Sequence, residues 1–149
     1  MSMRGAIAVA VDGSPASAAA LAEAVRLARA GEKPLLGVFV LDTGWADYIG
    51  NDWQSAAGAR QGFLDYIRSQ LEAQAETARE QFAAATRDHA AARFTVIPGE
   101  PLEALCDLMA QGEADTLVAG KEVFQICGRP SVKTLARDLA RRVRALRIV

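Results

Sequence analysis

The chain has 149 residues, 51% of them hydrophobic and 23% charged, and its formal net charge is −1 at pH 7. These values predict one globular domain over residues 1–149, long enough to bury a full core, and they exclude the strong charge that attracts nucleic acid or an anionic membrane. Without a bilayer-length apolar run or a signal-peptide core at the start, we expect a cytoplasmic protein with no membrane or nucleic-acid partner.

Apolar strands alternate with amphipathic helices through the first half of the chain. Residues 6–11 and 35–41 are short and wholly apolar, which is typical of strands covered on both faces of a parallel sheet. Between them, Pro15 suits the first turn of a helix that Ser14 caps and Gly31 follows. A longer helix is predicted from residue 61 or 62 to about 89, because an apolar stripe recurs at three- and four-residue steps. The stripe consists of Leu64, Ile67, Leu71, Ala75, Ala78, Phe82 and Ala85.

The second half continues the alternation with shorter elements. Pro98 and Gly99 are expected to end one strand, and Pro101 to open the next helix. A final helix is predicted to begin near Pro130 or near Lys133. The strands of this half are predicted at residues 93–97, 116–119 and 146–149.

The order of the predicted elements defines the fold class. Each parallel pair of strands needs a crossover, and the helical segments supply it at every step. The sequence therefore predicts an α/β domain built on an open parallel sheet of five strands with helices on both faces. No sequence repeat, low-complexity tract or internal linker divides the chain.

One connection, residues 42–60, is much longer than the others and contains Trp45, Tyr48 and Trp53 among glycines. Connections of this length are uncommon in compact domains and often form lids or binding loops. The segment either packs on its own aromatic side chains or on a partner subunit, or it recruits a protein partner.

Open α/β sheets bind ligands beyond the carboxyl ends of their strands, where neighbouring connections leave for opposite faces. Three segments meet that description: Asp12 with Gly13, the end of the second strand around Val40, and Gly120 after the fourth strand. The loop from Gly120 leads to the last helix, whose free N–H groups would suit a phosphate.

Four stretches resemble one known family along essentially the whole chain. They are the opening AIAVAVDGSPAS, the helical LAEAVRLA, the strand LLGVFVLD and the segment TLVAG. In these motifs the chain is similar to the universal stress proteins. The resemblance implies a sheet in the order 3-2-1-4-5, of the adenine nucleotide alpha hydrolase-like type, in a protein that commonly forms homodimers. It also implies that the first and fourth strands flank the ligand crevice.

Members of this family that bind ATP carry Gly, two residues, Gly, nine residues, and then Gly followed by Ser or Thr. A gapless count from Gly120 places Val123 and Lys133 where the second and third glycines stand, and Thr134 at the hydroxyl position. A rival alignment uses Pro130 and Ser131, but it shortens the loop by three residues and shifts the helix register. Val123 is β-branched and poorly suited to a glycine turn.

The resemblance carries over a set of cofactor-binding positions rather than a catalytic or metal site. Asp12 and the Val40 backbone correspond to the adenosine end, Gly120 to the ribose, and Lys133 and Thr134 to the phosphates. The expected cofactor, where one binds, is ATP or another adenine nucleotide. The cofactor-binding positions are Asp12, Gly13, Val40, Gly120, Lys133 and Thr134.

Three functions remain open from the sequence. The first is a cytosolic, non-enzymatic stress-response protein, homodimeric, with an altered nucleotide site. The second is an ATP-binding module or slow ATPase that uses Lys133 and Thr134 in place of the glycine loop. The third is an interaction module that recruits a protein partner through residues 42–60.

Overall fold

The computed structural model describes residues 5–51, 58–125 and 129–149. Five parallel strands form one sheet in the order β3-β2-β1-β4-β5, which confirms the order that the family resemblance implied. The strands are β1 (Ile7–Ala10), β2 (Leu35–Asp42), β3 (Ala92–Gly99), β4 (Thr116–Ala119) and β5 (Leu146–Ile148).

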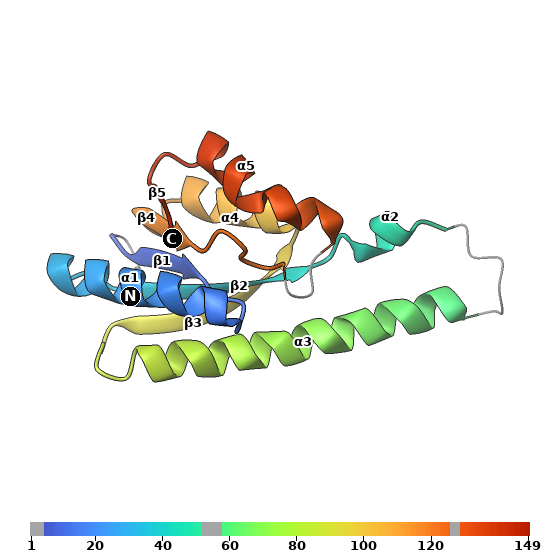
Figure 1. Cartoon of the computed structure of the whole chain (residues 1–149), viewed down its shortest axis with the longest axis horizontal. Coiled ribbons are helices and arrows are strands. Elements are labelled where there is room, and N and C mark those ends of the chain that lie inside the picture. The colour runs from blue at the N-terminus through green and yellow to red at the C-terminus, as the bar shows by residue number, and fades with distance from the viewer. Residues whose placement is uncertain (1–4, 52–57, 126–128) are drawn as a thin grey trace.

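Helices cover both faces of the sheet, as Figure 1 shows. Helices α1 (Pro15–Gly31) and α3 (Ala59–Ala85) lie on one face, and α4 (Pro101–Ala110) and α5 (Leu135–Arg142) lie on the other. The strand order turns back between β1 and β4, so the connections that follow these two strands leave for opposite faces. No helix among the described residues is long and apolar enough to cross a bilayer.

The central strands are buried along their whole length, as their unbroken apolar sequences require. Every residue of β1 is buried, and so are most of β2 and the last three residues of β4. Gly37 in β2 lies beneath the ring of Phe82 from α3, where a Cβ atom would come within 2.5 Å of Phe82 Cδ1. This close approach brings α3 down onto the sheet.

The described boundaries correct several sequence expectations. Pro98 and Gly99 belong to β3 instead of ending it, because β3 is an edge strand and can tolerate a residue without an N–H. The left-handed residue at the end of α1 is Glu32, with φ 51°, and Gly31 is the last helical residue. The final helix opens with a 3₁₀ turn, η1 (Pro130–Thr134), so both predicted starting points lie in the same turn.

The long connection holds secondary structure that its sequence did not predict. A short helix, α2 (Trp45–Ile49), follows β2, and α3 begins earlier than expected, at Ala59, and ends at Ala85 instead of near residue 89. Trp45 contacts the rings of Tyr48 and Phe63, so the prediction that this segment packs on its own aromatics holds for Trp45 and Tyr48. The predicted role of Trp53 lies outside the described residues.

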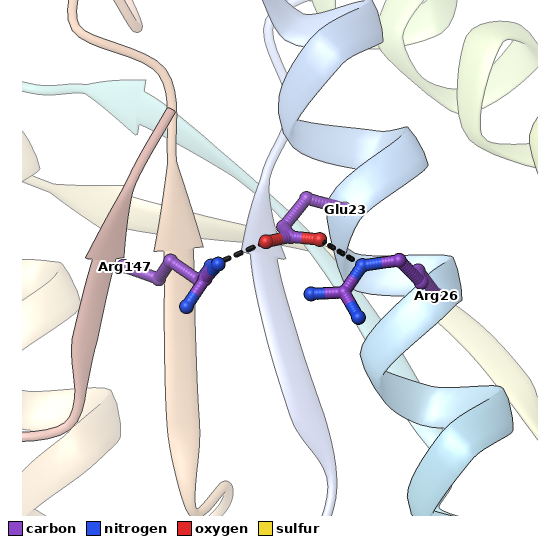
Figure 2. A network of polar contacts seen from close by, with 3 residues as sticks. All are labelled: Glu23, Arg26 and Arg147. Carbon is purple, nitrogen blue, oxygen red and sulfur yellow. Dashed lines mark hydrogen bonds and ion pairs between the residues drawn. The ribbon is translucent and has the colours of Figure 1, made fainter.

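The edge strand β5 is tied to α1 by a shared carboxylate, shown in Figure 2. Glu23 of α1 accepts a hydrogen bond of 2.5 Å from Arg26 Nε and a second one from Arg147 Nε on β5. The hydrogen bond from Arg26 holds the pKa of Glu23 below its ordinary value; burial opposes this effect and Arg147 adds to it. The ionised form of Glu23 therefore joins a terminal strand to the first helix.

Candidate functional site

The loop that follows β1 places Asp12 at the point where the strand order turns back. Asp12 is fully buried, and its Oδ1 accepts hydrogen bonds from Ser14 N at 2.9 Å, Ser14 Oγ at 2.5 Å and Ser17 Oγ at 2.5 Å. Its Oδ2 accepts a hydrogen bond of 2.9 Å from Phe124 N, which belongs to the loop after β4. The carboxylate is thus held by donors from both sides of the crevice, all supplied by the chain itself.

Helix α3 closes one side of this loop. Gly13 has a φ of 81°, and a Cβ atom there would lie 2.9 Å from Gln74 Nε2, so both the backbone and the space require glycine. Gln74 Nε2 donates a hydrogen bond to the carbonyl oxygen of Asp12, and Gln81 Nε2 donates one of 2.8 Å to the carbonyl oxygen of Ser14. The Gly13 turn is therefore explained by packing against α3.

The loop that follows β4 fills the other side of the crevice. Gly120 is buried against the first turn of α1, where an added Cβ atom would lie 3.3 Å from Ala16 O. Val123 and Phe124 are also buried, and the Phe124 ring packs edge-on against Phe39 with 5.7 Å between ring centroids. The left-handed residue of this turn is Phe124, with φ 64°, one position beyond Val123, which stands at the family's second glycine position. A bulky residue rarely adopts this conformation, and here it directs the Phe124 N–H toward Asp12.

Arg129, which the sequence reading did not single out, connects the same loop to the ends of β2 and β3. It is 9% exposed, and its Nε donates a hydrogen bond of 2.8 Å to Asp42 Oδ2, while Nη2 lies 3.4 Å from Glu100 Oε1. Its guanidinium lies against Gly44, where a Cβ atom would come within 2.6 Å of Cζ. Burial acts to lower the pKa of Arg129, but the hydrogen bond and charge of Asp42 outweigh it and raise that pKa. The sequence alone does not pair Arg129 with Asp42, because the two residues are 87 positions apart and meet only once the strand order is known.

Val40 lies where the backbone of β2 extends past β1. Val11 N donates to Val38 O at 2.9 Å, so the carbonyl of Val38 points toward β1. Because a strand repeats every two residues, the Val40 N–H and C=O also point toward the β1 side of β2. The pairing of β2 with β1 ends at Val38, while β2 continues to pair with β3 through Asp42. The Val40 backbone therefore faces the crevice from the side of β2.

The two predicted phosphate-binding residues lie in the turn before α5. Lys133 is exposed, and its carbonyl oxygen accepts a hydrogen bond of 3.4 Å from Gln125 Nε2. Thr134 Oγ1 donates a hydrogen bond of 2.8 Å to Asp138 Oδ2. A carboxylate beside this hydroxyl disfavours an anionic phosphate at the same place.

The structure thus brings Asp12, Gly13 and the loop after Gly120 into direct contact, with the Val40 backbone beside them. The Lys133 carbonyl oxygen accepts from Gln125 of this loop, and the Thr134 hydroxyl donates to Asp138 of α5. The part of the chain that the structure describes holds no group of three His, Cys, Asp or Glu residues suited to a metal ion.

Sequence comparison identifies the family to which this fold and site belong. The model of the universal stress protein family matches residues 3–123. The chain belongs to the universal stress protein family. The matched region ends at Val123, so Phe124, Arg129 and α5 lie beyond it. No curated protein matches the chain significantly.

Solved universal stress proteins share the fold along the whole chain. UspA from Lactobacillus plantarum is 21% identical, with a TM-score of 0.70, and the match covers 100% of this chain and 98% of that one. A universal stress protein in complex with cAMP is 24% identical over 99% and 98% of the two chains, with a TM-score of 0.65. One from Archaeoglobus fulgidus in complex with dAMP is 18% identical over 98% of each chain, also with a TM-score of 0.65.

Proposed function

We propose that this universal stress protein is a non-enzymatic, cytoplasmic stress-response regulator whose nucleotide crevice is closed by its own loop. The observation that carries the proposal is the Asp12 carboxylate, which is buried and accepts hydrogen bonds from two serines and from Phe124 N. An adenosine hydroxyl or amino group that approached Asp12 would have to displace one of these donors. A buried donor left without its partner costs about 1–3 kcal/mol.

The aromatic turn strengthens this closure. Phe124 packs against Phe39, so opening the crevice would expose a ring that is 6% exposed in the closed loop. Burying a large apolar side chain stabilises a protein by about 1.5–3 kcal/mol, and the left-handed backbone of Phe124 returns roughly 1–2 kcal/mol of that on release. The balance favours the closed loop, and a nucleotide has to overcome it.

The residues at the phosphate end of the crevice also support a site that does not bind nucleotide tightly. Asp138 lies beside Thr134 Oγ1, and the Lys133 side chain replaces a glycine that would let the backbone approach a phosphate. Arg129, a cation that could hold phosphate, is already neutralised by Asp42 and Glu100. We therefore expect no tight triphosphate binding.

Isothermal calorimetry with MgATP, cAMP and AMP at physiological salt tests the proposal. We expect no binding at micromolar affinity by the wild-type protein. The variant Phe124→Gly keeps the turn conformation accessible but removes the ring, so we expect it to bind an adenine nucleotide more tightly than wild type does. Micromolar binding of any of the three ligands by the wild type would contradict the closed crevice.

A second candidate function, an adenine-nucleotide module or slow ATPase, is favoured by the two complexes with cAMP and dAMP among the related structures. The residues that support it are Asp12 and Gly120, which occupy the family positions. Mass spectrometry of the denatured protein would detect co-purified nucleotide. If Lys133 and Thr134 hold the phosphates, ATP should raise the melting temperature of the wild type, and Lys133→Ala should abolish that shift. A wild type that carries no co-purified nucleotide and shows no thermal shift with ATP counts against this function.

We also propose that the protein forms homodimers through β5. This strand lies at the edge of the sheet, and an exposed edge invites pairing with a second strand.

A protein partner for the segment 42–60 remains a third candidate. Deleting residues 45–58 should abolish partner binding in that case, and unchanged binding would exclude it.

A further inference from the structure

A second cavity lies on the far side of β2 from the crevice, between the carboxyl ends of β2 and β3 and the first half of α3. Its volume is about 320 Å³, at the lower end of the range for small-molecule sites. It shares with the crevice only Asp42, whose carboxylate is already bound by Gly44 N and Arg129. The cavity is lined by Leu41, Asp42, Thr43, Trp45, Ala46, Gln61, Leu64, Asp65, Ile67, Arg68, Leu71 and Pro98.

The apolar stripe of α3 indicates that this cavity is built for an apolar occupant. The stripe runs without interruption from Leu64 to Phe82, but only its members from Leu71 onward are buried in the core. Leu64 and Ile67 are half-buried, line the cavity and belong to the first half of α3. In Figure 1 the beginning of α3 extends past the strand ends. These side chains continue the pattern of a core-facing helix at the end of the sheet, where they are covered only in part.

The charged side chains at the cavity each have a polar partner, whereas Trp45 Nε1 is buried and has no hydrogen-bond partner in the part of the chain that the structure describes. Gln61 Nε2 donates to Asp65 Oδ1 at 2.8 Å, and Arg68 Nε lies 2.9 Å from Glu72 Oε1. Asp42 is neutralised by Arg129. An anionic ligand would lose hydration here without gaining an unpaired cation, whereas a neutral ligand would lose less hydration and would accept a hydrogen bond from Trp45 Nε1 where it carries an acceptor.

Trp45 contributes an aromatic wall and holds α2 against α3. Its ring contacts Tyr48 and Phe63, with centroid distances of 5.7 and 6.5 Å. Arg60 of α3 donates hydrogen bonds to the carbonyl oxygens of Gly50 and Ala46, so the segment that carries Trp45 is fastened to the helix opposite. Both walls of the cavity are therefore positioned without any ligand.

We propose that this cavity is a binding site for a small, neutral, mainly apolar molecule, distinct from the nucleotide crevice. The ligand would cover Leu64 and Ile67, pack against the Trp45 ring and place its polar group at the rim formed by Gln61 and Asp65. The site goes beyond the proposed function, because none of its ligand contacts involves Asp12, Gly120 or Phe124.

Titration of the full-length protein with N-phenyl-1-naphthylamine, a neutral probe that fluoresces in apolar surroundings, tests the site. We expect saturable binding of one probe per chain and, in a Trp53→Phe variant that keeps Trp45 as its single tryptophan, quenching of the Trp45 emission with the same midpoint. Ile67→Trp, which fills the cavity, and Leu64→Asp, which charges its wall, should each weaken binding at least tenfold.

Tyr66→Ser provides the matched control. Tyr66 is 54% exposed on the same helix and does not line the cavity, so its loss should leave the probe affinity within twofold of wild type. Thermal unfolding of each variant verifies that it is folded. The proposal is overturned by non-saturable binding, by unchanged affinity in a folded wall variant, or by a loss of affinity in Tyr66→Ser that shows binding to the general surface.

Discussion

Asp12 shows how much of the candidate site depends on single hydrogen bonds. The sequence predicted Asp12 as a crevice residue from its place after an apolar strand, and the structure places it at the carboxyl end of β1. Its partner Phe124 is 112 residues away, and nothing in the local sequence indicates that a phenylalanine would adopt a left-handed conformation to reach it. A residue's place on a strand follows from local pattern, whereas its hydrogen-bond partner depends on the tertiary fold.

Replacing Asp12 by Asn should lower the free energy of unfolding by about 2–4 kcal/mol. The carboxamide has one acceptor oxygen instead of two, so at least one buried donor that now binds Asp12 would lose its partner. Urea denaturation would measure the loss. Asp88→Asn, at an exposed position, should change stability by less than about 0.5 kcal/mol. Equal stabilities of the two variants would show that the Asp12 network contributes little.

Glu23 makes a pH prediction possible at the same scale. The arginines keep its pKa in the folded protein below the value of 4.5 that applies without them, so its contribution to stability is present above pH 4.5 and is lost as the pH falls through the lowered folded value. Glu23→Gln should therefore weaken the decline of thermal stability on acidification, measured between pH 6 and 3. Glu80→Gln is the exposed control, and an equal effect of both substitutions would contradict the role of the Glu23 cluster.

At the scale of elements, the sequence predicted the strands and the longer helices but not all of their bounds. The strand 116–119 has the described bounds, and the helix that begins at Pro15 ends at Gly31, one residue later than predicted. Ser14 stands at the N-cap position as expected, but its hydroxyl binds Asp12 instead of capping the helix, which the local sequence does not reveal. The short helix α2 was missed because it has five residues and no apolar period, and it depends on contacts of Trp45 with α3. Pro98 was read as a break because its place at a sheet edge is a tertiary property.

The contact between α3 and β2 gives a prediction for a pair of elements. In Gly37→Ala the new Cβ atom would collide with the Phe82 ring, and this overpacking should cost about 1–3 kcal/mol of unfolding free energy. The double variant Gly37→Ala/Phe82→Leu should recover part of that loss, as a double-mutant cycle by urea denaturation would reveal. Strictly additive losses would mean that Gly37 and Phe82 do not determine the spacing of α3 from the sheet.

At the scale of the whole molecule, the alternation of strands and helices was enough to predict the fold class, because parallel crossovers leave few topologies. The strand order came from the family resemblance, and the structure confirms that order and places the point where it turns back between β1 and β4. The occupancy of the crevice could not be predicted, since it depends on how the loop after Gly120 packs. Val123 and Lys133 at two glycine positions of the family indicated that the loop differs from that of ATP-binding members, but not which conformation it adopts.

Homodimerisation through β5 is a prediction at this scale. Val149 N and Ala145 O bond to β4, so alternation points the Ile148 N–H toward the open edge. Ile148→Pro should therefore leave the β4 pairing intact but reduce the mass measured by light scattering from dimer to monomer. Ile148→Ala keeps the N–H and should remain dimeric; a monomeric wild type at high concentration would refute the interface.

The central claim is that the loop carrying Phe124 closes the nucleotide crevice. A crystal structure of the protein grown with saturating MgATP tests it most directly. We expect Phe124 N to remain hydrogen-bonded to Asp12, with no nucleotide between β1 and β4. Electron density for an adenine nucleotide beside Asp12 and Val40, with Phe124 displaced from Phe39, would contradict the account.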